Sequence, residues 1–314
     1  MSYGTDKHTY DRVDEWAKLP EGWRFVDVGG LGIDAQDNVY VLNRGSCPVM
    51  VFDREGNLLT SWGEGLFRRP HGCCVGFDGS IYCTDDGNHT VSKFTSEGKL
   101  LMTLGNRDQP SDTGYVLQPG LAASLATIRC GGPPFNRPTG VALSSSGEIY
   151  VSDGYGNARV HKFAADGTLL FSWGEPGSAP GQFCLPHSVG VDKQERVWVC
   201  DRENGRIQIF SPKGELLSLW VDVGGKPTGL FFGSDDTVYV SVKSGELPHG
   251  VSIFTLEGKL LARWGSTEAE TTLFWSPHAI VVDSRGDVYV GEIRHEMAKA
   301  DSGSRALQKF TRVL

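Results

Sequence analysis

The chain has 314 residues, with 30 lysines and arginines against 38 aspartates and glutamates and a formal net charge of −8. This length can bury a sizeable core, and the acidic balance argues against nucleic acid as a partner. Glycine, with 41 residues, exceeds its usual share and indicates many turns.

Residues 1–20 are expected to form an N-terminal extension, in which YDRVDEWAKL forms a short capping helix. This stretch is charged and has no apolar run, so a secretory signal is not expected. No stretch reaches the roughly 18 apolar residues of a membrane span, so no membrane partner is expected. The seven cysteines include no Cys-x-x-Cys pair, which favours reduced thiols, a cytoplasmic location and no cysteine-built zinc site.

From residue 21 onward one phrase recurs six times. It consists of an apolar triplet, a turn, a strand ending in Phe, a Gly-containing turn and a Leu-rich strand. The triplets begin at Val39, Ile81, Ile149, Val197, Val238 and Val288. Four short strands in each unit of about 40–50 residues are typical of a β-propeller blade. We therefore predict an all-β, six-bladed β-propeller that forms a single domain over residues 21–314.

The two ends of the chain are predicted to meet in the last blade. The sixth repeat stops after its third strand, and Trp23–Val28 offers a strand without a repeat of its own. Closing the blade with this N-terminal strand leaves few exposed sheet edges. Two insertions interrupt the repeats, at about 106–136 between the second and third blades and at 294–305 within the sixth.

The strongest signal of chemistry stands at the start of each blade, where a Pro is followed by a variable residue. Blades two, four and six have His71, His187 and His278, whereas blades three and five have Thr139 and Thr228. The start of the first strand is expected to face the central channel. Three imidazoles from alternate blades therefore predict a single catalytic zinc site with one open position.

Three turns that follow the apolar triplets add further candidates. Arg44 follows the triplet of blade one, Tyr155 that of blade three and Arg202 that of blade four. An arginine can hold a carboxylate with its planar fork, and a tyrosine beside zinc can act as a base.

Each of these residues also has a purely structural interpretation. Pro-His can be a consensus turn, and Asp85, Asp153 and Asp201 occupy matching places where an aspartate organises a turn. A packing consensus has no reason to follow a threefold pattern, however, and this favours the metal. The other histidines occupy unrelated repeat positions and are interpreted as surface or loop residues: His8, His89, His161, His249 and His295.

Several features of the sequence are the NHL-type repeats, the alternation of Pro-His and Pro-Thr, and the motifs SDGYGNARV, WGEPGSAPGQFCLPHS and DRENGRI. Together they resemble the peptidyl-α-hydroxyglycine α-amidating lyases, or peptidylamidoglycolate lyases. The resemblance covers about residues 25 to 314. It implies a zinc ion on His71, His187 and His278, with Arg44, Tyr155 and Arg202 as catalytic residues. The implied reaction splits an N-acyl-α-hydroxyglycine into an amide and glyoxylate.

The sequence departs from the family pattern at several positions. Ala279 stands where animal members have an Asp that helps to bind calcium, so structural calcium is not expected. Gly156 and Ile209 replace cysteines of secreted members. No attached hydroxylating domain is expected, so a small N-acyl or ureido α-hydroxy acid fits as well as a peptide.

Two other functions remain open from the sequence alone. One is a non-catalytic NHL propeller that binds a partner, which would need a docking patch and no metal in the channel. The other is a propeller hydrolase of the gluconolactonase type, which uses acidic and Asn ligands around a divalent ion. The predicted imidazoles suit zinc better than calcium. They therefore favour a lyase that acts on a small molecule over the propeller hydrolase.

Overall fold

Short antiparallel strands joined by tight turns make up most of the protein in the computed structural model, which describes residues 2–243, 249–266, 273–293 and 306–313. The chain forms two compact units. One comprises Met1–Glu64 and Val223–Leu314, and the other comprises Gly65–Asp222.

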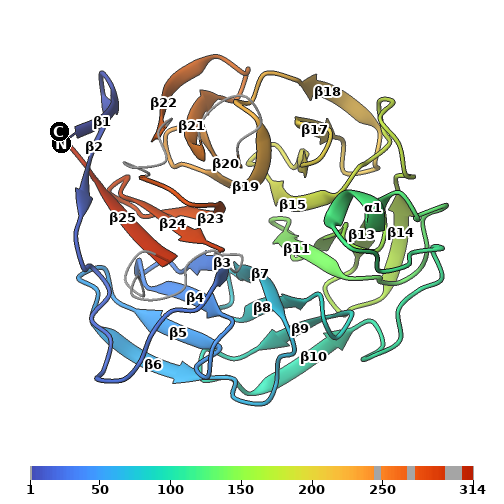
Figure 1. The fold of residues 1–314 in the computed structure, drawn as a ribbon, viewed down its shortest axis with the longest axis horizontal. Coiled ribbons are helices and arrows are strands. Elements are labelled where there is room, and N and C mark those ends of the chain that lie inside the picture. Colours follow the sequence, from blue (N-terminus) through green and yellow to red (C-terminus); the bar gives the residue numbers. More distant parts are fainter. Residues whose placement is uncertain (1, 244–248, 267–272, 294–305, 314) are drawn as a thin grey trace. The chain divides into compact units, whose positions relative to one another are not determined.

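The unit of residues 65–222 contains three four-stranded sheets, each ordered as the chain runs (Figure 1). The first holds β7 (Pro70–Val75), β8 (Ile81–Asp85), β9 (Thr90–Phe94) and β10 (Leu100–Leu104). The second holds β11 (Pro138–Leu143), β12 (Ile149–Asp153), β13 (Arg159–Phe163) and β14 (Leu169–Trp173), and the third β15 (Pro186–Val191), β16 (Val197–Asp201), β17 (Arg206–Phe210) and β18 (Leu216–Trp220). A short helix, α1 (Leu121–Leu125), lies between β10 and β11.

The other unit also contains three sheets. Two have four strands: β3 (Val28–Ile33), β4 (Val39–Asn43), β5 (Val49–Phe52) and β6 (Leu58–Trp62); and β19 (Lys226–Phe232), β20 (Thr237–Lys243), β21 (His249–Thr255) and β22 (Leu260–Ser266). The third has the order β1 (Ser2–Thr5), β2 (His8–Val13), β25 (Leu307–Arg312), β24 (Val288–Glu292), β23 (Pro277–Val282). Each sheet corresponds to one predicted repeat, so the prediction of an all-β, six-bladed β-propeller is confirmed.

Glycine fixes the hairpin between the third and fourth strands of a blade. Gly56 and Gly167 have φ of +81° and +88°, a region that glycine enters without steric cost. The amide of Gly56 donates to the carbonyl of Asp53 at 3.0 Å, and that of Gly167 to Ala164 at 2.9 Å. The strand register shifts directly beside each turn. This combination of a tight turn and a bulge explains the recurring Gly after each Phe.

Aromatic and branched side chains fill the space between neighbouring sheets of one unit. In residues 65–222, Tyr150 and Val160 of one sheet pack with Val199 and Phe210 of the next. Trp173, which ends a fourth strand, lies 5.7 Å from Phe210 between ring centroids. The Trp at the end of the repeated phrase therefore packs between sheets.

The sixth blade is closed by an N-terminal strand, as predicted, but a different segment supplies it. β2 pairs with β25 through Tyr10 opposite Arg312 and Val13 opposite Lys309, and β1 adds a fifth strand. The prediction that Trp23–Val28 closes the blade was wrong, because Val28 already begins the first strand of blade one. The capping helix predicted for YDRVDEWAKL was also wrong, because its first four residues belong to β2.

Replacing Tyr10 by Ala is expected to lower the free energy of unfolding by about 3–5 kcal/mol, as for other large aromatic residues in a core. The Tyr10 side chain is fully buried and stacks on Trp264 with ring centroids 4.9 Å apart. Urea unfolding of both proteins measures the change. Tyr3→Ala is the control, since Tyr3 is only half-buried. An unchanged unfolding midpoint for Tyr10→Ala would show that β2 does not complete the blade.

Candidate active site and metal centre

A β-bulge at the start of each blade holds the variable residue that the sequence singles out. In β7 the register against β8 shifts between Pro70 and Cys73, and in β15 the register against β16 shifts between Pro186 and Ser188. His71 and His187 lie within these shifts. The same irregularity recurs in the first strands of the other four blades. Bulges re-aim a side chain relative to its strand, so the fold itself gives this position a distinct direction.

In the three blades of residues 65–222, a carboxylate at the end of the second strand fixes the chain that leads into the bulge. Asp85 accepts hydrogen bonds from the amides of Arg68 at 2.7 Å and Arg69 at 2.9 Å. Asp201 does the same for Cys184 at 2.7 Å, although burial raises the pKa of Asp201. Asp153 accepts from the amide of Asn136 at 2.8 Å. The interpretation of the three aspartates as organisers of turns is thus confirmed.

Two of the predicted histidines hold a defined tautomer. The Nδ1 of His71 lies 2.7 Å from the carbonyl oxygen of Thr139, and that of His278 lies 2.8 Å from the carbonyl oxygen of Gly29. A carbonyl can only accept, so each Nδ1 carries a proton, and in the neutral ring Nε2 is then the atom with the lone pair. His71, His187 and His278 are all buried; the first two lie in the unit of residues 65–222 and His278 lies in the other unit. Neutral imidazoles oriented through Nδ1 are suitable ligands for a metal ion.

The hydroxyl of Tyr155 meets two of these histidines. It lies 3.4 Å from Nε2 of His71 and 3.2 Å from Nε2 of His187, and the side chain is 8% exposed. The amide of Tyr155 donates to the carbonyl of Arg137 at 3.4 Å, and the next amide donates to Asn136 at 3.0 Å. The phenol is therefore held against the imidazoles by its own loop.

Arg202 completes this group within residues 65–222. Its Nη1 donates to the Tyr155 hydroxyl at 3.3 Å, and its guanidinium carbon lies 5.6 Å from the centre of the tyrosine ring. The Nε of Arg202 pairs with Glu203 at 2.9 Å. The structure thus brings Tyr155, Arg202, His71 and His187 together.

Arg44 lies in the other unit, directly after β4. Its amide donates to the carbonyl of Asp27 at 2.9 Å, and its Nη1 lies 3.7 Å from the Asp27 carboxylate. The side chain is 10% exposed. A guanidinium can donate charge-assisted hydrogen bonds to an anionic ligand.

Two further arginines approach Tyr155, and the sequence analysis missed them. The guanidinium carbons of Arg69 and Arg137 lie 5.4 and 5.5 Å from the centre of the Tyr155 ring. Both precede the proline that opens a blade. The repeated Arg-Pro pair was the signal that could have identified them, since the other blades have Leu185, Lys226 and Ser276 at this place.

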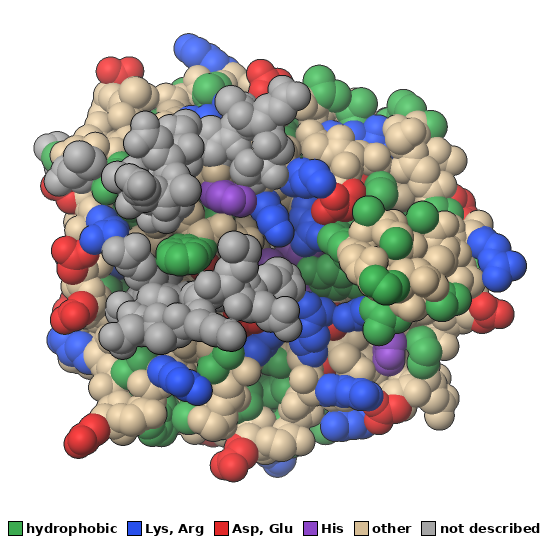
Figure 2. Space-filling view, in the orientation of Figure 1, with side chains coloured by type: hydrophobic (Ala, Val, Ile, Leu, Met, Phe, Trp, Pro, Cys, Tyr) green, Lys and Arg blue, Asp and Glu red, His purple; other side chains and the backbone are tan. Residues whose placement is uncertain are grey.

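The insertion at 106–136 is attached to the tyrosine loop. The Thr113 hydroxyl donates to the carbonyl of Gly156 at 2.6 Å, and the amide of Gly132 donates to Asn157 at 3.1 Å. Leu125 of α1 packs with Tyr155 and a neighbouring leucine. Figure 2 shows hydrophobic side chains gathered around the place of α1, and Leu117 of the insertion is 74% exposed. The insertion therefore forms a fixed wall beside the phenol. The second insertion, 294–305, lies outside the described residues.

The interpretation of the remaining histidines as surface or loop residues was wrong for two of them. His8 and His161 are buried. The Nδ1 of His161 lies 2.7 Å from the Ser172 hydroxyl, and its Nε2 lies 3.4 Å from Asp153. His161 falls within β13, and both faces of a propeller sheet are covered, which sequence position alone does not show. His295 lies outside the described residues.

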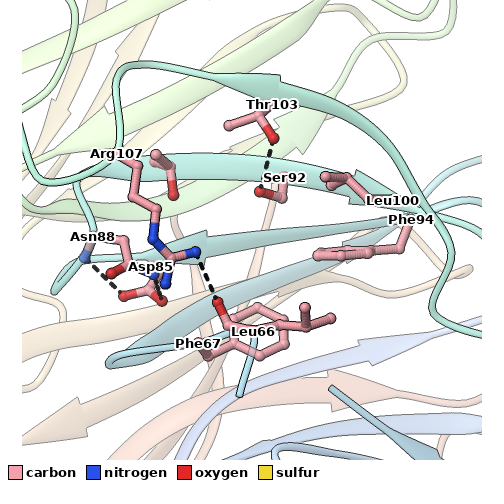
Figure 3. A pocket seen from close by; sticks show the side chains of 10 residues that line it. Leu66, Phe67, Asp85, Asn88, Ser92, Phe94, Leu100, Thr103 and Arg107 are labelled. Atoms are coloured by element: carbon pink, nitrogen blue, oxygen red, sulfur yellow. Dashed lines mark hydrogen bonds between the residues drawn. The ribbon is translucent and has the colours of Figure 1, made fainter. Parts of the chain in front are cut away.

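A separate small pocket lies along β9 and β10 (Figure 3). Arg107 donates to the carbonyl of Leu66 at 3.4 Å, and Asn88 donates to Asp85 at 2.9 Å. The residues that line it include none of the candidate site residues. This pocket is therefore distinct from the group around Tyr155.

His89, which contacts the loop of Arg137, makes the stability of the folded protein depend on pH. The amide of Arg137 donates to Nδ1 of His89 at 3.1 Å, so the ring is neutral there. Burial lowers the pKa of His89 below its ordinary value of 6.5. The unfolded chain therefore binds a proton at a pH where the folded chain does not. This contribution to stability is complete above pH 6.5 and is lost as the pH falls below it.

Replacing His89 by Asn is expected to reduce the loss of stability between about pH 7.5 and pH 5.5. Asn tolerates the φ of +60° at this position and can accept the same hydrogen bond without titrating. Urea unfolding at both pH values measures the difference. An identical pH dependence in the two proteins would remove His89 from this linkage.

No helix in the described part of the chain combines the length and the apolar character that crossing a membrane requires.

The NHL repeat family matches residues 135–163 and 183–210. Among solved structures, a streptogramin B lyase has a TM-score of 0.61 over 96% of this chain and 97% of its own, at 14% identity. That likeness supports the fold alone.

Two curated relatives define the family. Human NHL repeat-containing protein 3 is 30% identical over 99% of this chain and 86% of its own length. Peptidyl-alpha-hydroxyglycine alpha-amidating lyase 1 of Drosophila melanogaster is 28% identical over 76% of this chain and 45% of its own length. The chain therefore belongs to the family of NHL-repeat proteins that includes NHL repeat-containing protein 3 and relatives named peptidyl-α-hydroxyglycine α-amidating lyases.

Proposed function

We propose that this protein is a zinc-dependent lyase that cleaves the C–N bond of an N-acyl-α-hydroxyglycine, or of a related small α-hydroxy acid. The products are an amide and glyoxylate. The observation that carries the proposal is the Tyr155 hydroxyl at hydrogen-bond distance from His71, His187 and Arg202. This geometry combines a proton acceptor, ligands for an ion and a cation in one buried place.

The three histidines fit a zinc ion. His71, His187 and His278 are buried, and the Nδ1 contacts of His71 and His278 leave their Nε2 atoms as lone-pair donors. Imidazole suits zinc, and three protein ligands leave a position for substrate. A bound zinc ion would act as a Lewis acid that makes the substrate hydroxyl easier to deprotonate.

Tyr155 acts as the base in this proposal. Its phenolate takes the proton from the α-hydroxyl of the substrate, the carbonyl of glyoxylate forms, and the bond between the α-carbon and the amide nitrogen breaks. The leaving nitrogen takes up a proton, which Tyr155 can return. No atom is oxidised or reduced, so no redox cofactor is needed. Arg202 stabilises the phenolate by donating to its oxygen, which is electrostatic assistance of the oxyanion-hole kind.

The carboxylate of the α-hydroxy acid requires a cationic partner of its own. Arg44 and Arg202 are the candidates that the sequence supplies. The side chain of Arg44 is 10% exposed, and its Nη1 lies 3.7 Å from Asp27. A planar guanidinium offers a carboxylate two parallel hydrogen bonds.

Several relatives support this assignment by name. The lyase of Drosophila melanogaster described above acts, by its name, on peptidyl-α-hydroxyglycine. A probable lyase of the same name from Caenorhabditis elegans is 32% identical over 52% of this chain and 43% of its own length. For the present protein we propose the shared reaction, with a small-molecule substrate that need not be a peptide.

Product analysis on three substrates tests the function. The protein is incubated separately with N-benzoyl-α-hydroxyglycine, ureidoglycolate and a gluconolactone. The proposal predicts glyoxylate from at least one of the first two and no hydrolysis of the lactone. Lactone hydrolysis without release of glyoxylate would show that the protein is a lactonase and not a lyase. If zinc-loaded protein converts none of the three substrates, the alternative of a non-catalytic propeller that binds a partner would be favoured.

A further inference from the structure

Arg69 and Arg137 form an anion-recognition pair beside Tyr155 that the proposed chemistry has not used. They enter from two neighbouring blades, and each directly precedes the proline that opens its blade. Their guanidinium carbons lie at nearly equal distances, 5.4 and 5.5 Å, from the centre of the Tyr155 ring. Two cations from separate strands therefore flank one buried phenol.

Asp86 joins the two arginines. Its carboxylate is completely buried and accepts from Nη1 of Arg69 at 2.9 Å and from Nη2 of Arg137 at 3.3 Å. Two guanidinium groups thus share one carboxylate in these ion pairs. The three side chains together carry one net positive charge next to Tyr155, and a positive charge in a partly buried place attracts an anion.

The two arginines are held in place and remain accessible. Nη1 of Arg137 donates to the Tyr115 hydroxyl at 2.9 Å, and the amide of Arg69 is fixed by Asp85. The side chains of Arg69 and Arg137 are 30% and 21% exposed. A ligand can therefore reach them, and little side-chain entropy remains to be lost on binding.

We propose that Arg69 and Arg137 bind the carboxylate of the substrate and so restrict it to α-hydroxy acids with a free carboxylate. This inference rests on the proposed function. It also assigns the contact with the Tyr155 hydroxyl and the binding of the carboxylate to different arginines. Arg202 serves the Tyr155 hydroxyl, which it contacts directly, and the Asp86-bound pair serves the carboxylate through charge-assisted hydrogen bonds.

Calorimetric titration with an unreactive pair of ligands tests the inference. N-benzoylglycine has the carboxylate but lacks the α-hydroxyl, and N-benzoylglycinamide lacks the negative charge. We expect the protein to bind the acid roughly ten- to a hundredfold more tightly than the amide, as for other charged hydrogen bonds. Arg69→Gln and Arg137→Gln should each remove most of this preference without weakening binding of the amide.

The controls separate recognition from folding. Arg68→Gln removes a neighbouring arginine that is 67% exposed and paired with Asp108, and it should keep the full preference. Arg69→Lys and Arg137→Lys retain a cation for Asp86 and should retain part of the preference, with an unchanged circular dichroism spectrum. A protein without preference for the acid, or folded Gln variants that keep it, would overturn the inference.

Kinetics on the hydroxylated substrate distinguish this inference from the proposed function. If the wild-type protein prefers the acid and the variants lose that preference, carboxylate recognition stands even where no glyoxylate is released. If glyoxylate is released and both Gln variants keep the KM of the wild type, the lyase stands and the role of the arginine pair is refuted.

Discussion

Tyr155→Phe is expected to retain the bound metal ion and to lower kcat by about 10²–10⁴, the usual contribution of a positioned acid or base. The substitution removes one oxygen and leaves the ring, which packs with Leu125 and Leu185. His71 and His187 lose a hydrogen-bond partner but keep both ring nitrogens. Steady-state release of glyoxylate, together with elemental analysis of the same sample, measures both quantities.

Tyr150→Phe provides the matched control for this experiment. Tyr150 is a buried tyrosine of β12 in the same blade, and it packs beside Lys162 and Trp173, away from the histidine group. Its hydroxyl should be dispensable for turnover. Equal kcat values for Tyr155→Phe and the wild type would remove the phenol from the mechanism.

His187→Ala is expected to lose the metal ion and turnover together. Only two of the three proposed ligands remain, so the affinity should fall by more than the 10–100-fold that loss of a ligand's hydrogen-bond partner costs. The hydroxyl of Tyr155 also loses its contact at 3.2 Å. Metal content per chain after dialysis and the glyoxylate assay are measured on the same preparation.

Two further variants keep the result interpretable. His187→Gln preserves more of the side-chain volume in the buried site and should lose metal equally. His249→Ala removes a half-buried histidine outside the group and should keep metal and rate. A folded His187→Ala protein that still carries one ion per chain would refute the proposed ligand set.

The repeating part of the fold could be predicted because its signals are local. Apolar triplets, turn glycines and the Pro-His step recur at corresponding places, and each acts within one hairpin or one bulge. β2 could not be predicted in this way. Its charged Asp11 and Arg12 are typical of a solvated segment, and its pairing partner β25 lies some three hundred residues away along the chain.

For the candidate site too, the sequence could predict only those residues that a comparison of the repeats singles out. The histidines and Tyr155 stand at positions where corresponding residues differ between blades, and comparison of the repeats reveals them. Comparison of the repeats could also have singled out Arg69 and Arg137 as Arg-Pro pairs, but their contacts with Asp86 and the ring of Tyr155 are distances in space that no repeat pattern contains. Burial of His161 likewise depends on the neighbouring ring of Phe135, 5.2 Å away.

The central claim is that this chain uses a bound metal ion to split an α-hydroxy acid at its C–N bond. The most direct test quantifies benzamide and glyoxylate released from N-benzoyl-α-hydroxyglycine by protein that is first stripped with a chelator and then reloaded with one equivalent of zinc. We predict equimolar products, background rates after stripping and recovery on reloading. Turnover that is unchanged by complete removal of metal, or the absence of both products from zinc-loaded protein, would contradict the account.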